Sequence, residues 1–165
     1  MTLHADYDPD NIFAKILRGE MPSVKVYEDE TVLAFMDVFP QSEGHTLIIP
    51  KAVQARNFLD LPTEKVGAYM ERVQKVARAV EKALSPDGVV VTQFNGAPAG
   101  QTVFHLHFHV IPRWSDKALS GHASGQMADI ADLEAIASKI RARSCTLRPA
   151  TIKRSITPLS MAYLR

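Results

Sequence analysis

Three histidines alternate with apolar residues in the run His105-Leu106-His107-Phe108-His109. Residues two apart on a β-strand share one face, so a strand here would carry three imidazoles on one side and turn Leu106 and Phe108 toward a core. A lone histidine is usually a structural or surface residue. Three of them at this spacing indicate a reaction site or a metal site.

A metal site is one interpretation of the histidine run. Alternate residues on a strand lie roughly 6.6 Å apart, so the Cα atoms of His105 and His109 would be about 13 Å apart. Zinc holds imidazole nitrogens at about 2 Å, and a third ligand from the run would require a bent strand. The sequence has a single cysteine, Cys145, and no His-Glu-x-x-His pattern. We therefore expect no metal site, and keep a metal-dependent hydrolase as an alternative.

Nucleophilic catalysis is the second interpretation of the run. Imidazole has an unperturbed pKa of about 6.5, so its neutral form is available to attack at neutral pH. Attack on phosphorus through a phosphorylated histidine replaces one hard displacement by two easier ones. The loop before the run suits a phosphate, because Gly100 allows close backbone approach and Gln101 and Thr102 offer side-chain donors. This combination favours chemistry on a phosphate ester or anhydride.

The elements that position the run are predicted from apolar periodicity and turn residues. We expect helices over 11–18, 62–84 and 127–143, strands over 24–28, 32–37, 46–49, 89–94 and 103–111, and loops over 40–44, 95–100 and 113–126. This order predicts one α+β domain over residues 1–143 with a mainly antiparallel sheet. Residues 144–165 show no sustained period and are expected to form a loosely attached tail.

The composition excludes several classes of partner. Nineteen basic residues face eighteen acidic ones among 165, for a net charge of +1, so no basic footprint for nucleic acid or an anionic membrane exists. The first ten residues lack an apolar signal core, and the apolar runs are too short to cross a bilayer. One cysteine allows no disulfide within the chain. We expect a cytoplasmic protein that binds neither nucleic acid nor membrane.

The run and its neighbours resemble the histidine triad (HIT) family, whose signature is His-x-His-x-His followed by two apolar residues. Here the signature spans residues 105–111, and the segments 11–16, 44–51 and 100–104 are also similar to the family. The resemblance covers about residues 10–143 in the right order. It implies a five-stranded antiparallel sheet with two main helices and a short N-terminal helix. It also implies a homodimer in which two sheets join into ten strands.

The resemblance further implies release of a nucleoside monophosphate, of the AMP type, through a nucleotidyl-histidine. By position in the motif, His107 would be the nucleophile and His109 would contact the phosphate and the leaving group. His105 and His45 would complete the surrounding hydrogen-bond network, and Asp37 would bind the ribose hydroxyls. The implied base slot is Ile12, Phe13, Ile16 and Phe35, and the implied phosphate side is Asn95, Gly100, Gln101 and Thr102. On pattern alone, the apolar residues could be core and Asp37 a turn residue.

Two departures from the family bear on cofactor and substrate. Many bacterial relatives carry Cys-x-x-Cys at the start of the first helix as half of a structural zinc site, but this chain has Asn11 and Ala14 there. We therefore expect no structural zinc and no required cofactor, although a divalent cation can accompany the substrate. The residues Pro112-Arg113-Trp114 resemble a Pro-Arg branch rather than the Gly-Gly phosphoramidase branch. The leaving group stays open between polyphosphate and amine.

Nucleotide hydrolysis is the leading hypothesis, with dinucleoside polyphosphates or nucleoside phosphoramidates as substrates. A nucleotidyltransferase that passes the nucleotide to a sugar phosphate is a related alternative, but such enzymes are usually longer than this chain. A regulatory or scaffold protein that binds nucleotides with little turnover is a further alternative. It differs from the leading hypothesis in predicting binding without product release.

Overall fold

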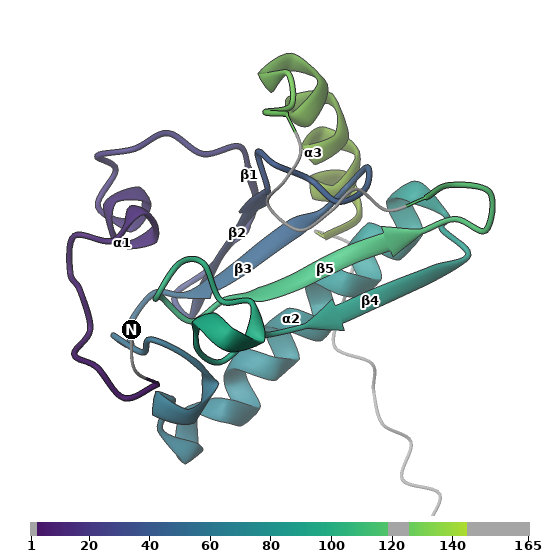
Figure 1. Ribbon diagram of the computed structural model, residues 1–165. Coiled ribbons are helices and arrows are strands. Elements are labelled where there is room, and N and C mark those ends of the chain that lie inside the picture. Colours follow the sequence, from purple (N-terminus) through teal and green to yellow (C-terminus); the bar gives the residue numbers. More distant parts are fainter. Residues whose placement is uncertain (1–2, 119–125, 145–165) are drawn as a thin grey trace, which may run out of the picture.

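The computed structural model describes residues 3–118 and 126–144, so residues 145–165 of the predicted tail lie outside the described residues. The described elements are the helices α1 (Ile12–Leu17), α2 (Thr63–Leu84) and α3 (Ile130–Ser144), the 3-10 turns η1 (Phe58–Asp60) and η2 (Ala97–Ala99), and the strands β1 (Lys25–Glu28), β2 (Val32–Met36), β3 (Thr46–Pro50), β4 (Gly88–Thr92) and β5 (Phe108–Arg113). Figure 1 shows their arrangement. Ser144 belongs to α3, so the helix runs one residue beyond the predicted boundary at 143.

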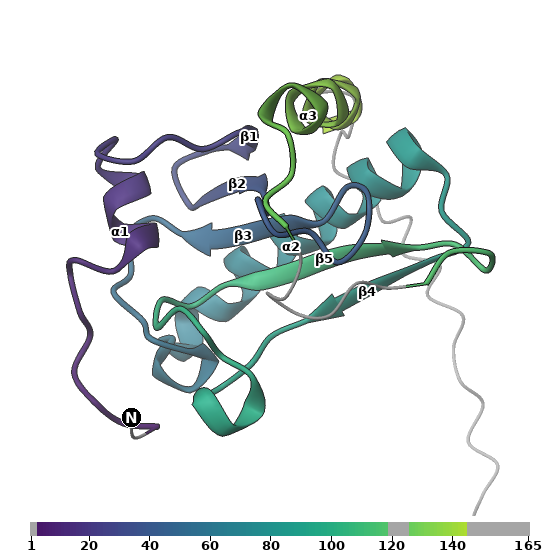
Figure 2. The ribbon, with the colours of Figure 1, turned by 45° about the horizontal axis from the view of Figure 1, so that its top comes forward.

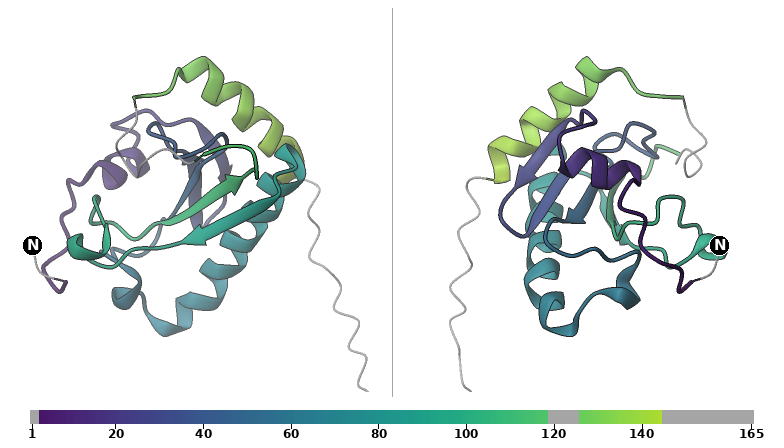
Figure 3. Two further views of the ribbon diagram at one scale, coloured as in Figure 1. Left: turned by 45° about the vertical axis from the view of Figure 1, so that its right-hand side comes forward. Right: turned by 90° about the vertical axis from the view of Figure 1, so that its left-hand side faces the viewer.

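The five strands form one antiparallel sheet in the order β1-β2-β3-β5-β4. This confirms the predicted α+β class and antiparallel sheet. Helix α2 lies across one face of the sheet, and α3 packs against α2 and along β1 (Figures 2 and 3). Helix α1 lies on the other side, where its Phe13 packs against Phe35 of β2 and Leu47 of β3. No helix in the described part of the chain is long and apolar enough to cross a membrane.

Helix α2 is the main support of the sheet. Its buried residues recur every three or four positions and include Tyr69, Val73, Val76 and Val80. Pro62 stands immediately before the helix, and Ser85 ends it in a left-handed conformation. The Tyr69 hydroxyl donates to the Ile48 carbonyl at 2.7 Å, which ties the helix to β3 directly.

Two apolar clusters cover the two faces of the sheet. The larger lies between the sheet, α2 and α3 and contains Ile48, whereas the smaller contains Leu47 and Ile49 together with Phe13 of α1. Successive residues of β3 thus point to opposite clusters, as the pleat requires. With both faces covered, β2 and β3 are buried at every position, although the sheet is antiparallel. The smaller cluster lies on the same face of the sheet as the histidines, and its Phe13 packs against His107.

The predicted fifth strand, 103–111, is wrong at its start. Strand β5 begins at Phe108, so of the three histidines only His109 lies in the sheet. The register pairs Ile48 of β3 with Phe108, and continuing it would place Leu106 opposite Pro50. Proline has no N–H to donate, so this ladder cannot continue. The Leu106 amide instead donates to the Ala55 carbonyl at 2.7 Å.

In residues 105–107 the side chains still alternate between the two faces, although these residues precede the β5 ladder. Leu106 and Phe108 are buried in the larger cluster, as predicted, while the imidazoles lie on the other side. Helix α3 begins three residues later than predicted. The Asp129 carboxylate accepts the Ala131 amide at 2.7 Å and so caps the helix there. The predicted loop 95–100 contains η2, and β4 ends at Thr92 rather than at residue 94.

Candidate active site

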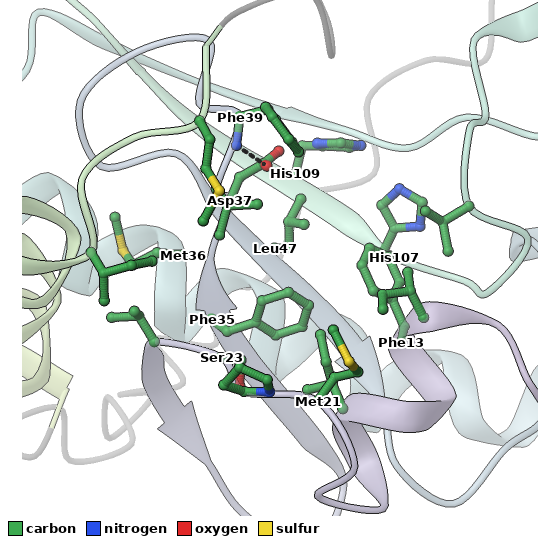
Figure 4. A pocket seen from close by; sticks show the side chains of 18 of the residues that line it. Phe13, Met21, Ser23, Phe35, Met36, Asp37, Phe39, Leu47, His107 and His109 are labelled. Atoms are coloured by element: carbon green, nitrogen blue, oxygen red, sulfur yellow. Dashed lines mark hydrogen bonds between the residues drawn. The ribbon is translucent and has the colours of Figure 1, made fainter.

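A cavity of about 640 Å³ opens between α1, the sheet and the start of α3 (Figure 4). Of the residues predicted for the site, its wall contains Ile12, Phe13, Ile16, Phe35, Asp37, Thr102, His107 and His109. The wall also contains residues that the sequence did not single out, among them Met21, Ser23, Phe39, Leu47, Val103, Met127, Ile130 and Glu134. Residues from distant parts of the chain thus form one largely apolar hollow with two imidazoles on its wall.

A hydrogen bond to the backbone fixes the tautomer of His107. Its Nδ1 lies 2.6 Å from the carbonyl oxygen of His105. A carbonyl can only accept, so Nδ1 carries the proton and the neutral ring keeps its lone pair on Nε2. The ring is buried and packs edge-to-face against Phe13 and His109, with centroid distances of 5.1 and 4.8 Å. The tautomer with its proton on Nδ1 is therefore the one that this geometry favours.

His45 and His109 form a second pair of imidazoles. His45 Nε2 lies 2.9 Å from His109 Nδ1, and the Gln41 amide donates to His45 Nδ1 at 3.2 Å. In the neutral pair, His45 therefore donates from Nε2, and His109 carries its own proton on Nε2. Oδ2 of Asp37 lies 3.4 Å from His45 Nδ1, so the carboxylate stabilises positive charge that develops on this pair. The arrangement can supply and recover a proton.

Asp37 has two roles in the structure. Its Oδ1 accepts the Phe39 amide at 2.9 Å, which is the dashed bond in Figure 4. This is the turn function that its position after β2 suggested. Asp37 also lines the cavity, so its place in the turn is compatible with the predicted ribose contact, which stays a prediction.

His105 lies outside the cavity wall. Its side chain is buried, and burial lowers the pKa of the ring to about 4, so it is neutral at neutral pH. The Tyr7 hydroxyl lies 2.7 Å from His105 Nδ1. Sequence reasoning missed Tyr7, because a single tyrosine before a short helix gives no signal of its own. Tyr7 and His105 are 98 positions apart in the sequence, so only the folded structure reveals their contact.

The four apolar residues predicted to bind the base line the cavity, and two of them are also buried in the core. Phe13 and Phe35 pack edge-to-face with ring centroids 5.4 Å apart, and both are buried while lining the hollow. Ile12 and Ile16 extend this wall along α1. The Asn11 side chain accepts the Phe13 and Ala14 amides and thereby caps the helix. All four apolar residues thus line the cavity, and their role in binding a base stays a prediction.

Of the four residues predicted to contact the phosphate, the structure places one on the cavity wall and three outside it. Thr102 lines the cavity, but Gln101 braces the loop: its Oε1 accepts the Gly96 amide at 2.8 Å and its Nε2 donates to the Val103 carbonyl at 3.0 Å. Asn95 Oδ1 accepts the Phe58 amide at 2.9 Å. Gly100 has φ +103°, a conformation that favours glycine. A phosphate role for these three residues stays a prediction.

One group of side chains could hold a metal ion within the described residues. Ligand atoms of Asp37, His45 and His109 lie within 4.8 Å of one another. His105 and His107 do not belong to this group, so the described part of the chain gives no support to an ion held by the whole histidine run. The hydrogen bond between His45 and His109 already uses one nitrogen of each ring. Proton transfer fits this group better than a resident metal.

Comparison with known proteins agrees with the geometry. The family model described as the HIT domain matches residues 18–116. The chain is 39% identical over 120 residues to an adenylylsulfatase of Arabidopsis thaliana, covering 69% of this chain and 60% of that protein. It is 39% identical over 118 residues to an adenosine 5'-monophosphoramidase of Saccharomyces cerevisiae, covering 72% of each. A crystal structure of a HIT-like protein from Bartonella henselae has a TM-score of 0.78 and 50% identity, covering 84% of this chain and 99% of that chain.

Proposed function

The chain belongs to the histidine triad (HIT) family, and on this premise we propose that it hydrolyses nucleotides and releases a nucleoside monophosphate of the AMP type. The proposed substrates are dinucleoside polyphosphates or nucleoside phosphoramidates. The observation that carries the proposal is the bond from His107 Nδ1 to the His105 carbonyl, 2.6 Å long. That bond leaves Nε2 of a cavity-wall histidine unprotonated, as a nucleophile requires.

The reaction follows from the placement of the imidazoles. His107 Nε2 attacks the α-phosphorus and forms an N–P bond, while the bond from phosphorus to the leaving oxygen or nitrogen breaks. His109 donates its Nε2 proton to the leaving group, and the charge left on the pair with His45 is stabilised by Asp37. Water then attacks the nucleotidyl-histidine and returns a proton to His109. The nucleoside monophosphate leaves, and His107 is restored.

Two relatives support an adenylyl substrate. Both an adenylylsulfatase and an adenosine 5'-monophosphoramidase are named for reactions at an adenosine 5'-phosphate, with a sulfate and an amine as the other group. The apolar slot beside His107 suits the base, and Asp37 suits the ribose. The shared element of these substrates is the adenylyl group, so the proposal makes AMP the common product.

An acid- or base-quench experiment tests the proposal. Incubation with adenosine phosphoramidate or a dinucleoside polyphosphate should give AMP, with and without chelator, and a base-stable, acid-labile adduct on His107. His107→Ala should lose both the adduct and turnover while retaining nucleotide binding. If a chelator abolishes the release of AMP, the result would support a metal-dependent hydrolase instead. Binding without turnover across the nucleotide panel would support a scaffold.

We also propose a homodimer formed through β4. This strand is one edge of the sheet, and Val90 and Val91 on it are 39% and 44% exposed. An apolar edge strand offers unpaired backbone groups to a second strand. Two copies joined at β4 would give the ten-stranded sheet expected from the family. The molar mass by light scattering should be twice that of the chain, and Val91→Lys should reduce it toward the monomer.

A further inference from the structure

We propose that Tyr7 is a positioning residue for the nucleophile: its hydroxyl holds His105, and the His105 carbonyl in turn fixes the ring of His107. The inference rests on the proposed function, because it concerns the same imidazole. It adds a residue from the N-terminal segment, of which the described residues 3–11 do not line the cavity. Tyr7 therefore acts at a distance from any bound nucleotide.

The contact between Tyr7 and His105 is specific in geometry. The hydroxyl lies 2.7 Å from Nδ1, and the two rings meet edge-to-face with centroids 5.6 Å apart. Burial raises the pKa of Tyr7, so the phenol keeps its proton at neutral pH. Since His105 is neutral there too, the phenol can donate to Nδ1 and leave the imidazole proton on Nε2. One rotamer and one tautomer of His105 are selected.

The backbone at His105 needs this support because the sheet does not supply it. Strand β5 begins at Phe108, so the carbonyl that orients His107 lies three residues outside the ladder. The following amide, that of Leu106, is held by the Ala55 carbonyl at 2.7 Å. With the ring of His105 held by Tyr7, the peptide between the two histidines is fixed from both sides. The acceptor for His107 Nδ1 is then preorganised.

Tyr7 is itself presented by an anchored segment. The Arg56 guanidinium donates to the Asp6 carbonyl at 2.8 Å. The same guanidinium lies over the ring of Phe104, 4.5 Å from its centroid. Phe104 directly precedes His105, so one buried arginine links the residue before Tyr7 with the residue before its target. Figure 3 shows this N-terminal segment running alongside the body of the protein.

Loss of the Tyr7 hydroxyl should therefore change the chemistry rather than binding. Without it, the polar restraint on the His105 ring is its interaction with the Pro50 backbone, and the His105 carbonyl can move from His107 Nδ1. The tautomer of His107 that has its proton on Nε2, and is not nucleophilic, then becomes more populated. One hydrogen bond corresponds to roughly a tenfold change in rate. We expect kcat to fall by about that factor and KM to stay within about twofold.

The test compares Tyr7→Phe with Tyr27→Phe in the full chain. Tyr27 also donates from its hydroxyl, to Asp29 at 2.8 Å, but it lies on β1 and outside the cavity wall. Steady-state kinetics, thermal melting and ¹⁵N NMR of the imidazoles are measured on both variants and on the wild type. Tyr7→Phe should lower kcat and shift the His107 tautomer, whereas Tyr27→Phe should do neither.

Each other result overturns a defined part of the argument. Equal kcat in the two variants, or an unchanged His107 tautomer in Tyr7→Phe, would overturn the role of Tyr7. A drop in melting temperature large enough to account for the lost activity would show that the tyrosine only supports the fold, with the same consequence. The NMR measurement needs no turnover. A wild type that releases no AMP would therefore count against the proposed function and leave the tautomer result to decide on Tyr7.

Discussion

His45 and His109 share a buried hydrogen bond, with His45 Nε2 2.9 Å from His109 Nδ1, although 64 residues separate them in the sequence. The pairing of β3 with β5 brings them together, since Leu47 stands opposite His109. The histidine that would protonate the leaving group thus takes its tautomer from a residue just before the neighbouring strand. Under the proposed function, His45 would act through His109 without touching the substrate.

His45→Gln is expected to lower kcat with little change in KM. The variant removes the partner that holds the proton of His109 on Nε2, and one hydrogen bond of this kind corresponds to about 1–1.5 kcal/mol, or roughly tenfold in rate. Steady-state kinetics with a phosphoramidate and with a better leaving group measure the effect, which should shrink for the better leaving group. His4→Gln, at an exposed histidine, is the control. An equal loss with both substrates would contradict this role.

The pH dependence of stability should report His105. Its folded pKa is about 4 because burial disfavours the charged ring, against about 6.5 in the unfolded chain. As the pH falls from 6.5 to 4 the unfolded state binds the proton first, so stability present above pH 6.5 is lost, by about 3 kcal/mol in total. Urea titrations at pH 7.5, 5.5 and 4.5 measure this. His105→Gln should show a shallower fall over the same range, and an identical slope would refute the assignment.

Ile16→Ser should weaken nucleotide binding and leave kcat nearly unchanged. Ile16 lines the cavity but contacts no reacting atom in the proposed mechanism, so the lost apolar contact affects ground state and transition state alike. Removing it is expected to raise KM about tenfold, from roughly 1.5 kcal/mol of lost burial. Leu59→Ser is the control, because Leu59 is 60% exposed and lies outside the cavity wall. A change in kcat alone would argue against a base slot here.

Asp37→Asn should reduce discrimination between ribose and dideoxyribose. The amide keeps an oxygen for the Phe39 amide, so the turn is retained, but the charge that would bind the sugar hydroxyls is lost. A hydrogen bond to a charged group contributes about 1.5–3 kcal/mol, so KM for the ribonucleotide should rise at least tenfold. KM for the 2′,3′-dideoxy substrate should be nearly unaffected, whereas kcat should fall for both substrates because Asp37 also stabilises charge on the pair of His45 and His109. An equal change in KM for both substrates would show that Asp37 interacts with His45 and does not bind the ribose.

Gly44→Ala should destabilise the fold next to His45. Gly44 has φ +84°, and an added Cβ would lie 2.2 Å from the Leu84 side chain. Strain and overlap together should cost about 1–3 kcal/mol of unfolding free energy. Gly67→Ala is the matched control, since Gly67 lies inside α2 and its Cβ would meet nothing within 4 Å. That variant should gain about 0.5–1 kcal/mol from helix propensity, and chemical denaturation separates the two outcomes.

Periodicity and turn residues were enough to predict the fold class, and they located the elements because their buried faces repeat at fixed intervals. Helix α2 is the clearest example, with its buried residues spaced as the sequence indicates. The start of β5 could not be predicted, since it depends on Pro50 in a neighbouring strand whose register the sequence does not reveal. Tyr7 was missed for a similar reason: its partner, His105, lies 98 residues further along the chain. Long-range pairing, rather than local preference, decided both.

Because β5 begins at Phe108, one of the three histidines lies in the sheet and the other two lie before it. His109 is paired on both sides, with Leu47 and with Thr92, while His105 and His107 precede the ladder. Small openings of a segment outside a sheet cost less free energy than global unfolding. Opening of residues 105–107 would nevertheless expose Leu106, which is fully buried. The two imidazoles outside the sheet are therefore held by packing of this segment and by the Leu106 amide, rather than by the ladder.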